Sequence, residues 1–326
     1  MVGGHPLCLA GGHAHLVRLG ALRFPRSGGL SDVIVCTTLR GGGRDAGTPG
    51  RTSLGMGLLI RLLGTGGAAN AARHQACLLL TWGDDAQGGR VLLDTGNGMD
   101  VVRRILASGF APDGVRDIFV SHQHVDHVGG LEPLLLWSAI QRLKKGDHPP
   151  TGPTRVYAEP RVIQGIRGLF HAIATVAPRL LGDSLQLVPM PDGAVASLRG
   201  GARLTTFLVD HQPVDGGAMG CVVELDGKRL AYSGDTRPVK RLIEVAEGAN
   251  VLIHEAGGLD EHRAEIHRQG HSTAGDVGRA GRAAAVGRVV LTHVPAEALI
   301  TPMLGEAADT FGGPVELATD LGELQI

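Results

Sequence analysis

A short segment of this chain gathers four metal-ligating side chains within six positions. The segment is Ser121–Gly130, and its ligating side chains belong to His122, His124, Asp126 and His127. Imidazole nitrogens and carboxylate oxygens are the donors that zinc and similar divalent metals prefer, and ordinary packing does not call for so many of them together. The sequence therefore predicts a metal site here rather than a polar surface turn.

The residues on either side of this cluster predict the elements that hold it. Residues 117–120, Asp-Ile-Phe-Val, are typical of a short buried strand, and apolar residues recur at helical spacing from Leu131 to Leu143. Open α/β sheets usually build their sites on loops that follow the carboxyl ends of strands. We therefore expect the ligands on a strand-to-helix loop at one edge of a sheet.

The second half of the chain offers further donors in equivalent places. His211 follows the apolar segment 204–209, Asp235 follows 230–233, and His293 follows 289–291. Each of these side chains comes directly after a predicted strand, so all are expected at the same sheet edge as the first cluster. Together with that cluster they supply enough donors for two metal sites.

The pattern of apolar residues from position 58 onward predicts an α/β fold. Strands are predicted at 58–63, 76–81, 90–93, 204–209, 221–225, 230–232, 251–253 and 289–291, and helices at 101–107, 239–246 and 274–285. Two similar halves of this kind predict two sheets packed face to face with helices outside, a four-layer αββα sandwich.

Residues 1–56 differ from the rest and include a Gly-, Arg- and Thr-rich stretch at 40–49 that is typical of a flexible linker. We expect this part to be a partly ordered extension, and residues 57–326 to form the main domain. The scattered Cys8, Cys36, Cys77 and Cys221 predict a reducing compartment rather than a disulfide framework.

Composition limits the partners that the chain can be expected to bind. The formal net charge is −1 and only 3% of residues are aromatic, so the chain has no strong field and few stacking platforms for nucleic acid. No apolar run approaches the ~20 residues of a membrane span, and the N-terminus lacks a secretory signal pattern. We therefore expect a cytoplasmic protein without a membrane partner.

The order of the predicted ligands resembles the metallo-β-lactamase superfamily from about Leu58 to the C-terminus. Three further segments are similar to its ribonuclease Z-like branch, which also includes phosphodiesterase and arylsulfatase relatives. They are Leu-Gly-Thr-Gly at 63–66, Ile-His-Glu-Ala at 253–256 and Gly-His-Ser-Thr-Ala at 270–274. The resemblance implies a hydrolase domain of the αββα type over residues 57–326.

The same resemblance implies a division of the ligands between two metal ions. One ion would be held by His122, His124 and His211, the other by Asp126, His127 and His293, with Asp235 bridging the two. Asp94, in Leu-Asp-Thr-Gly, would support the ligand loop from behind. Zinc is the expected metal, with manganese or iron as alternatives, because all three accept these donors.

Two metals ~3.5–4 Å apart suit hydrolysis of a phosphodiester, with a bridging hydroxide as nucleophile. The resemblance implies that Asp126 accepts the proton of the attacking water, that His271 acts as general acid and that Glu255 orients His271. Thr65 and Arg73 are predicted to contact the substrate, the guanidinium as a phosphate ligand.

Departures from the branch's pattern keep the substrate open between phosphate and sulfate esters. Val125 stands where the branch has glycine, and the apolar segment 169–177 lies where its tRNA-binding arm would be. A ribonuclease Z-like phosphodiesterase is the first hypothesis, with precursor tRNA as one candidate substrate. The alternatives are an aryl- or alkylsulfatase-like enzyme, a lactonase-type hydrolase and a non-catalytic metal-binding scaffold. The apolar segments 131–137 and 169–177 would also suit a homodimer surface.

Overall fold

The computed structural model describes residues 17–26, 29–38, 57–83, 88–146, 152–173, 175–211 and 217–326. The chain divides into two compact units, residues 1–53 and 54–326. In the first unit, β1 (Val17–Arg26) and β2 (Gly29–Thr38) pair antiparallel. The predicted linker at 40–49 lies outside the described residues.

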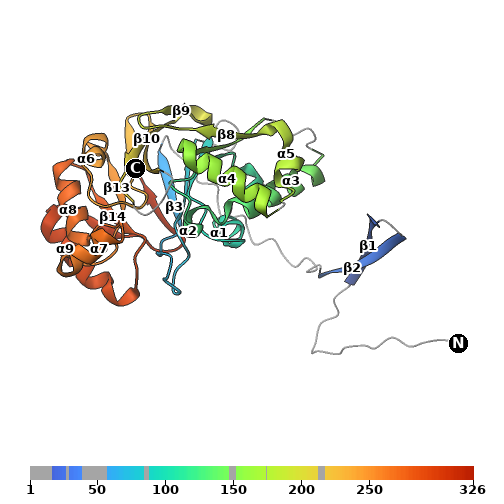
Figure 1. The fold of residues 1–326 in the computed structure, drawn as a ribbon, viewed down its shortest axis with the longest axis horizontal. Coiled ribbons are helices and arrows are strands. Elements are labelled where there is room, and N and C mark those ends of the chain that lie inside the picture. The colour runs from blue at the N-terminus through green and yellow to red at the C-terminus, as the bar shows by residue number, and fades with distance from the viewer. Residues whose placement is uncertain are drawn as a thin grey trace, which may run out of the picture. The chain divides into compact units, whose positions relative to one another are not determined.

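Two seven-stranded sheets form the second unit (Figure 1). The first has the order β16-β3-β4-β5-β6-β7-β8, with β3 (Leu58–Gly64), β4 (Cys77–Trp82), β5 (Gly89–Leu93), β6 (Asp117–Phe119), β7 (Thr154–Ala158), β8 (Leu185–Pro189) and β16 (Gly322–Gln325). The second has the order β15-β14-β13-β12-β11-β10-β9, with β9 (Val195–Ser197), β10 (Arg203–Val209), β11 (Ala218–Leu225), β12 (Lys228–Tyr232), β13 (Val251–Glu255), β14 (Val289–Thr292) and β15 (Val315–Leu317). The last strand of the chain therefore returns to the first sheet, where it pairs antiparallel with β3.

Each sheet packs against one apolar core on each of its two faces, because side chains alternate between the faces along a strand. Successive side chains of a strand point to opposite faces, so Ile60 and Leu80 pack between the sheets whereas Leu79 and Leu92 face the helices. All four side chains are completely buried. Such strands are apolar on both faces, which is typical of sheets covered on both sides.

Helices cover the outer face of each sheet. Those of the first half are α1 (Asp100–Ala107), α2 (Val125–Val128), α3 (Leu131–Lys144), α4 (Pro160–Ala172) and α5 (Ala177–Leu181). Those of the second half are α6 (Lys240–Ala246), α8 (Ala274–Ala283) and α9 (Ile300–Phe311). The short helix α7 (Arg263–Arg268) precedes α8 in the chain. The predicted four-layer αββα sandwich is confirmed (Figure 1).

One prediction about the surface is wrong. Leu131, Leu134 and Leu135 of α3 are buried against the first sheet, so residues 131–137 do not offer an exposed apolar face for a homodimer. The helical spacing of these leucines fits the sheet that they cover. Within the described residues, no helix is long and apolar enough to cross a membrane.

Candidate metal centre

Strand direction brings the predicted site residues to one edge of the sandwich. In the first sheet β5 and β6 are parallel, and Asp94 and Ser121 follow their carboxyl ends. In the second sheet β12, β13 and β14 are parallel. β10 runs in the same direction as β12, because both strands pair antiparallel with β11. The carboxyl ends of all these strands therefore carry the site.

The predicted ligands lie in two groups of convergent side-chain atoms. In each group the potential ligand atoms lie within 4.8 Å of one another. The groups are His122, His124 and His211, and Asp126, His127 and His293. The structure thus assembles donors that are separated by up to 171 residues of sequence (His122 to His293) into the two sets that the resemblance implies.

Asp235 stands between the two groups. Its Oδ2 lies 3.4 Å from Nε2 of both His127 and His293, and 3.9 and 4.0 Å from Nε2 of His211 and His122. Burial opposes its ionisation, but the neighbouring charges of His293 and His127 lower the pKa of Asp235 well below its usual value. A single carboxylate oxygen therefore faces histidines of both groups.

The donor set fits divalent cations. Nε2 of His122 and Nε2 of His127 are buried and have no hydrogen-bond partner in the part of the chain that the structure describes. A buried polar atom without a partner is costly, and bound cations would give each of these nitrogens a partner. Burial lowers the pKa of His122, His124 and His211, which favours the neutral imidazole that binds metals.

Asp94 organises the first ligand loop from beneath. Its carboxylate accepts hydrogen bonds from the backbone N–H and hydroxyl of Ser121, both at 2.7 Å, and from the hydroxyl of Tyr232 at 2.7 Å. It also binds Nδ1 of His127 at 2.8 Å, which turns Nε2 of that ring toward Asp235. Against the effect of burial, Asp235 and Asp94 raise the pKa of His127 well above its usual value, and a cation at Nε2 would replace the proton.

His271 lies beside the two groups and is held by Glu255. Nδ1 of His271 is 3.0 Å from Oε1 of Glu255, and the same oxygen accepts the backbone N–H groups of Thr236 and Ser272. Burial favours the neutral ring, but Glu255 outweighs it and raises the pKa of His271 to about 9, a rise that bound cations would oppose. The His271 ring stacks on His293, with 5.7 Å between ring centroids.

The sequence is similar to known proteins over most of its length. Residues 89–294 match a family model described as "Beta-lactamase superfamily domain". The protein named Ribonuclease Z from Pyrobaculum calidifontis is 30% identical over 265 residues, covering 73% of this chain and 87% of the relative. Ribonuclease Z from Haloferax volcanii is 26% identical over 321 residues, covering 83% and 96%. The chain belongs to the metallo-β-lactamase superfamily, in its ribonuclease Z-like branch.

Solved structures of this superfamily share the fold. The metallo-β-lactamase fold protein YhfI from Bacillus subtilis matches with a TM-score of 0.68 at 20% identity, covering 83% of this chain and 100% of its own. Human tRNase Z, short form, matches with a TM-score of 0.63 at 19% identity, covering 82% and 98%. Family membership makes the chain a metallo-hydrolase, and divalent metal binding belongs to this fold.

The sequence did not point to three groups that position ligands in this metallo-hydrolase. They are the hydroxyls of Ser121 and Tyr232, both bound to Asp94, and the carbonyl oxygen of Gly270, 2.8 Å from Nδ1 of His211. Tyr232 was foreseeable, because a hydroxyl at the end of an otherwise apolar strand needs a buried partner. The carbonyl of Gly270 carries no signal in the sequence.

Both predicted substrate contacts, Thr65 and Arg73, make hydrogen bonds within the fold. Thr65 is completely buried, and its hydroxyl is bound to Asp320 at 2.8 Å. The guanidinium of Arg73 is engaged by Thr65, by the carbonyl oxygen of Ala318 and by the carboxylate of Glu297. These side chains fasten the C-terminal segment to the end of β3, and a role in binding phosphate stays a prediction.

Replacing Asp320 with alanine is expected to lower the free energy of unfolding by about 2–3 kcal/mol, because buried donors lose a charged acceptor. Asp320 accepts the N–H groups of Thr65 and His74, at 3.0 and 2.8 Å, and pairs with Arg104 at 3.2 Å. Denaturant unfolding checks this. Glu244→Ala is the control, because its ion pair with Lys240 is exposed and worth at most about 1 kcal/mol. Equal losses in both variants would contradict the assignment.

Proposed function

We propose that this chain is a dinuclear metal-dependent phosphodiesterase, with zinc as the first metal to test. The observation that supports it is the position of the Asp235 carboxylate, whose Oδ2 lies within 4.0 Å of Nε2 atoms in both ligand groups. Under this proposal His122, His124 and His211 would hold one cation, Asp126, His127 and His293 would hold the other, and Asp235 would be a donor available to both. When bound, divalent cations supply a water of lowered pKa and positive charge for the phosphoryl oxygens.

Asp126 is the proposed acceptor of the water proton. Its Oδ2 lies 3.2 Å from Nε2 of His293 and 3.6 Å from Nε2 of His127. Burial disfavours its charge, but the hydrogen bond from His293 and the two imidazoles lower the pKa of Asp126 to about 2. The carboxylate is therefore ionised at neutral pH, as a ligand and base must be.

His271 is the proposed general acid. Glu255 binds its Nδ1, which leaves Nε2 as the atom that can give a proton to the leaving oxygen. Glu255 is buried, so its charge acts on the ring with little screening by solvent. The pair thus orients the imidazole and favours its protonated form.

The purified chain is expected to hydrolyse bis(4-nitrophenyl) phosphate when supplied with zinc or manganese, and to lose this activity with a chelator. His271→Ala should lower kcat by about 10²–10⁴, the range of general acid catalysis, while bound metal stays unchanged. Release of 4-nitrophenolate and elemental analysis measure the two quantities. His262→Ala, which removes an exposed histidine, is the control.

Other outcomes of this assay would replace the proposal. Hydrolysis of an aryl sulfate or a lactone without hydrolysis of the diester would establish one of the alternative enzymes. Two bound metals without turnover of any ester would leave a metal-binding scaffold. Because the relatives are named Ribonuclease Z, a 3′-extended tRNA precursor belongs in the same assay as the candidate nucleic-acid substrate.

A further inference from the structure

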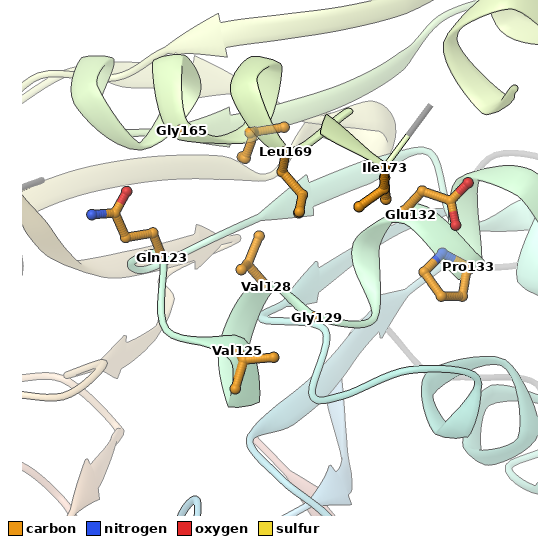
Figure 2. A pocket seen from close by; sticks show the side chains of 10 residues that line it. Gln123, Val125, Val128, Gly129, Glu132, Pro133, Gly165, Leu169 and Ile173 are labelled. Carbon is orange, nitrogen blue, oxygen red and sulfur yellow. The ribbon is translucent and has the colours of Figure 1, made fainter. Parts of the chain in front are cut away.

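A pocket of about 440 Å³ opens beside the first ligand loop (Figure 2). One wall is formed by Leu169 of α4 and by Ile173, the first residue after α4. The other wall is formed by Val125 and Val128 of α2. The volume lies in the range of small-molecule sites, about 300–1,000 Å³. We call it the ligand-loop pocket.

The lining of the ligand-loop pocket is unsuited to a polyanion. None of its ten lining residues is lysine, arginine or histidine. The one charged side chain is the carboxylate of Glu132, which accepts a hydrogen bond from the hydroxyl of Thr175. An anionic phosphate chain would meet apolar surface and a like charge here, whereas an uncharged apolar group would gain by leaving water.

Apolar side chains of the pocket stand unusually exposed. Val125 is 63% exposed and Ile173 is 52% exposed. Single exposed apolar residues are common, but two that face one hollow mark a surface that a ligand covers. Val125 lies directly between the predicted ligands His124 and Asp126, so an apolar side chain stands next to the site.

The pocket borders the loop that carries the first predicted metal ligands. Gln123 and Val125 line the pocket, and they alternate along the chain with His122, His124 and Asp126. Adjacent Cα atoms are about 3.8 Å apart, so pocket wall and metal ligands belong to one short loop. Gly165 leaves room for Gln123, because a Cβ at position 165 would lie 2.7 Å from Oε1 of Gln123.

We propose that the ligand-loop pocket binds an uncharged apolar group, aryl or branched alkyl, of the ester that is hydrolysed at the adjacent metal centre. This inference rests on the proposed function and names its substrate class. The phosphoryl group would lie at the metal ligands, and the apolar group would contact Val125, Leu169 and Ile173. Substrates of this class are small esters rather than polynucleotides.

The test is calorimetric titration of the metal-loaded chain with phenylphosphonate and with methylphosphonate, two anions that differ in their apolar group. Phenylphosphonate should bind at least tenfold more tightly than methylphosphonate. Ile173→Asp should reduce that preference to about twofold or less without changing the Kd of methylphosphonate, which also shows that the variant is folded. Leu106→Asp is the matched control, since Leu106 is 48% exposed on α1 and does not line the pocket.

Each outcome decides the proposal. Equal affinities for the two phosphonates, a preference that survives Ile173→Asp, or no binding of either anion would overturn it. Hydrolysis of bis(4-nitrophenyl) phosphate is measured on the same preparations. A tenfold preference without turnover refutes the proposed function and upholds the pocket, whereas turnover with equal affinities refutes the pocket alone. Cleavage of precursor tRNA with equal affinities would also overturn it in favour of RNA.

Discussion

Asp235→Ala is expected to lower kcat/KM for bis(4-nitrophenyl) phosphate by about a thousandfold and to reduce bound metal to one ion per chain or less. The carboxylate faces both ligand groups, so its loss removes the donor that we propose the two cations share. Electrostatic stabilisation by a metal is worth several kcal/mol, and about 4 kcal/mol corresponds to about a thousandfold in rate. Steady-state kinetics and elemental analysis of freshly purified protein measure both effects.

Two control variants separate this effect from general damage. Asp235→Asn keeps the volume of the side chain and removes its charge, so it should resemble the alanine variant in activity. Asp192→Ala removes a carboxylate that is 40% exposed and paired with Arg241, and it should leave activity and metal content unchanged. Full metal content in Asp235→Asn would show that the carboxylate is not shared by two cations.

The strands that hold the site could be predicted because they are continuous apolar segments. The segments 204–209 and 289–291 were expected to be strands, and β10 (Arg203–Val209) and β14 (Val289–Thr292) differ from them by one residue each. β14 is buried at every position, so packing and sequence signal agree there. Where the apolar pattern of a segment matches its burial in this way, a single sequence is enough to predict a strand.

Edge strands could not be predicted in the same way. β16 (Gly322–Gln325) has only intermediate and exposed residues, and its position is decided by pairing with β3, which lies more than 250 residues earlier.

The start of helix α4, by contrast, is indicated by the local sequence. Pro160 occupies the first helical position and Glu159 caps it by accepting the N–H of Arg161, a pattern typical of helix starts.

The sequence indicated which side chains are candidate metal donors. It did not distinguish side chains that stabilise the fold from side chains that bind a ligand. Arg73 has the chemistry of a phosphate ligand, but the C-terminal segment occupies it through Ala318 and Glu297. That contact joins residues more than 220 positions apart, and no local pattern announces it. Residue type defines what a side chain can bind, and tertiary structure decides what it does bind.

Asp94→Asn is expected to lower metal affinity about ten- to a hundredfold and to lower the free energy of unfolding by about 2–5 kcal/mol. Asp94 is completely buried, and the amide would present a donor to Ser121, Tyr232 and His127, which require an acceptor. Its φ of 57° lies in the left-handed region, which asparagine tolerates better than alanine. The asparagine variant therefore isolates the polar contacts from backbone strain.

Tyr232→Phe completes a double-mutant cycle with Asp94→Asn. The single change removes one hydrogen bond to a buried carboxylate and should lower the free energy of unfolding by about 1.5–3 kcal/mol. In the Asp94→Asn background the same change should have a much smaller effect, because the partner is already altered. Denaturant unfolding of the four metal-free proteins measures the coupling. Additive losses would mean that Tyr232 stabilises the second sheet independently of Asp94, and that the ligand loop is held by Ser121 and His127 alone.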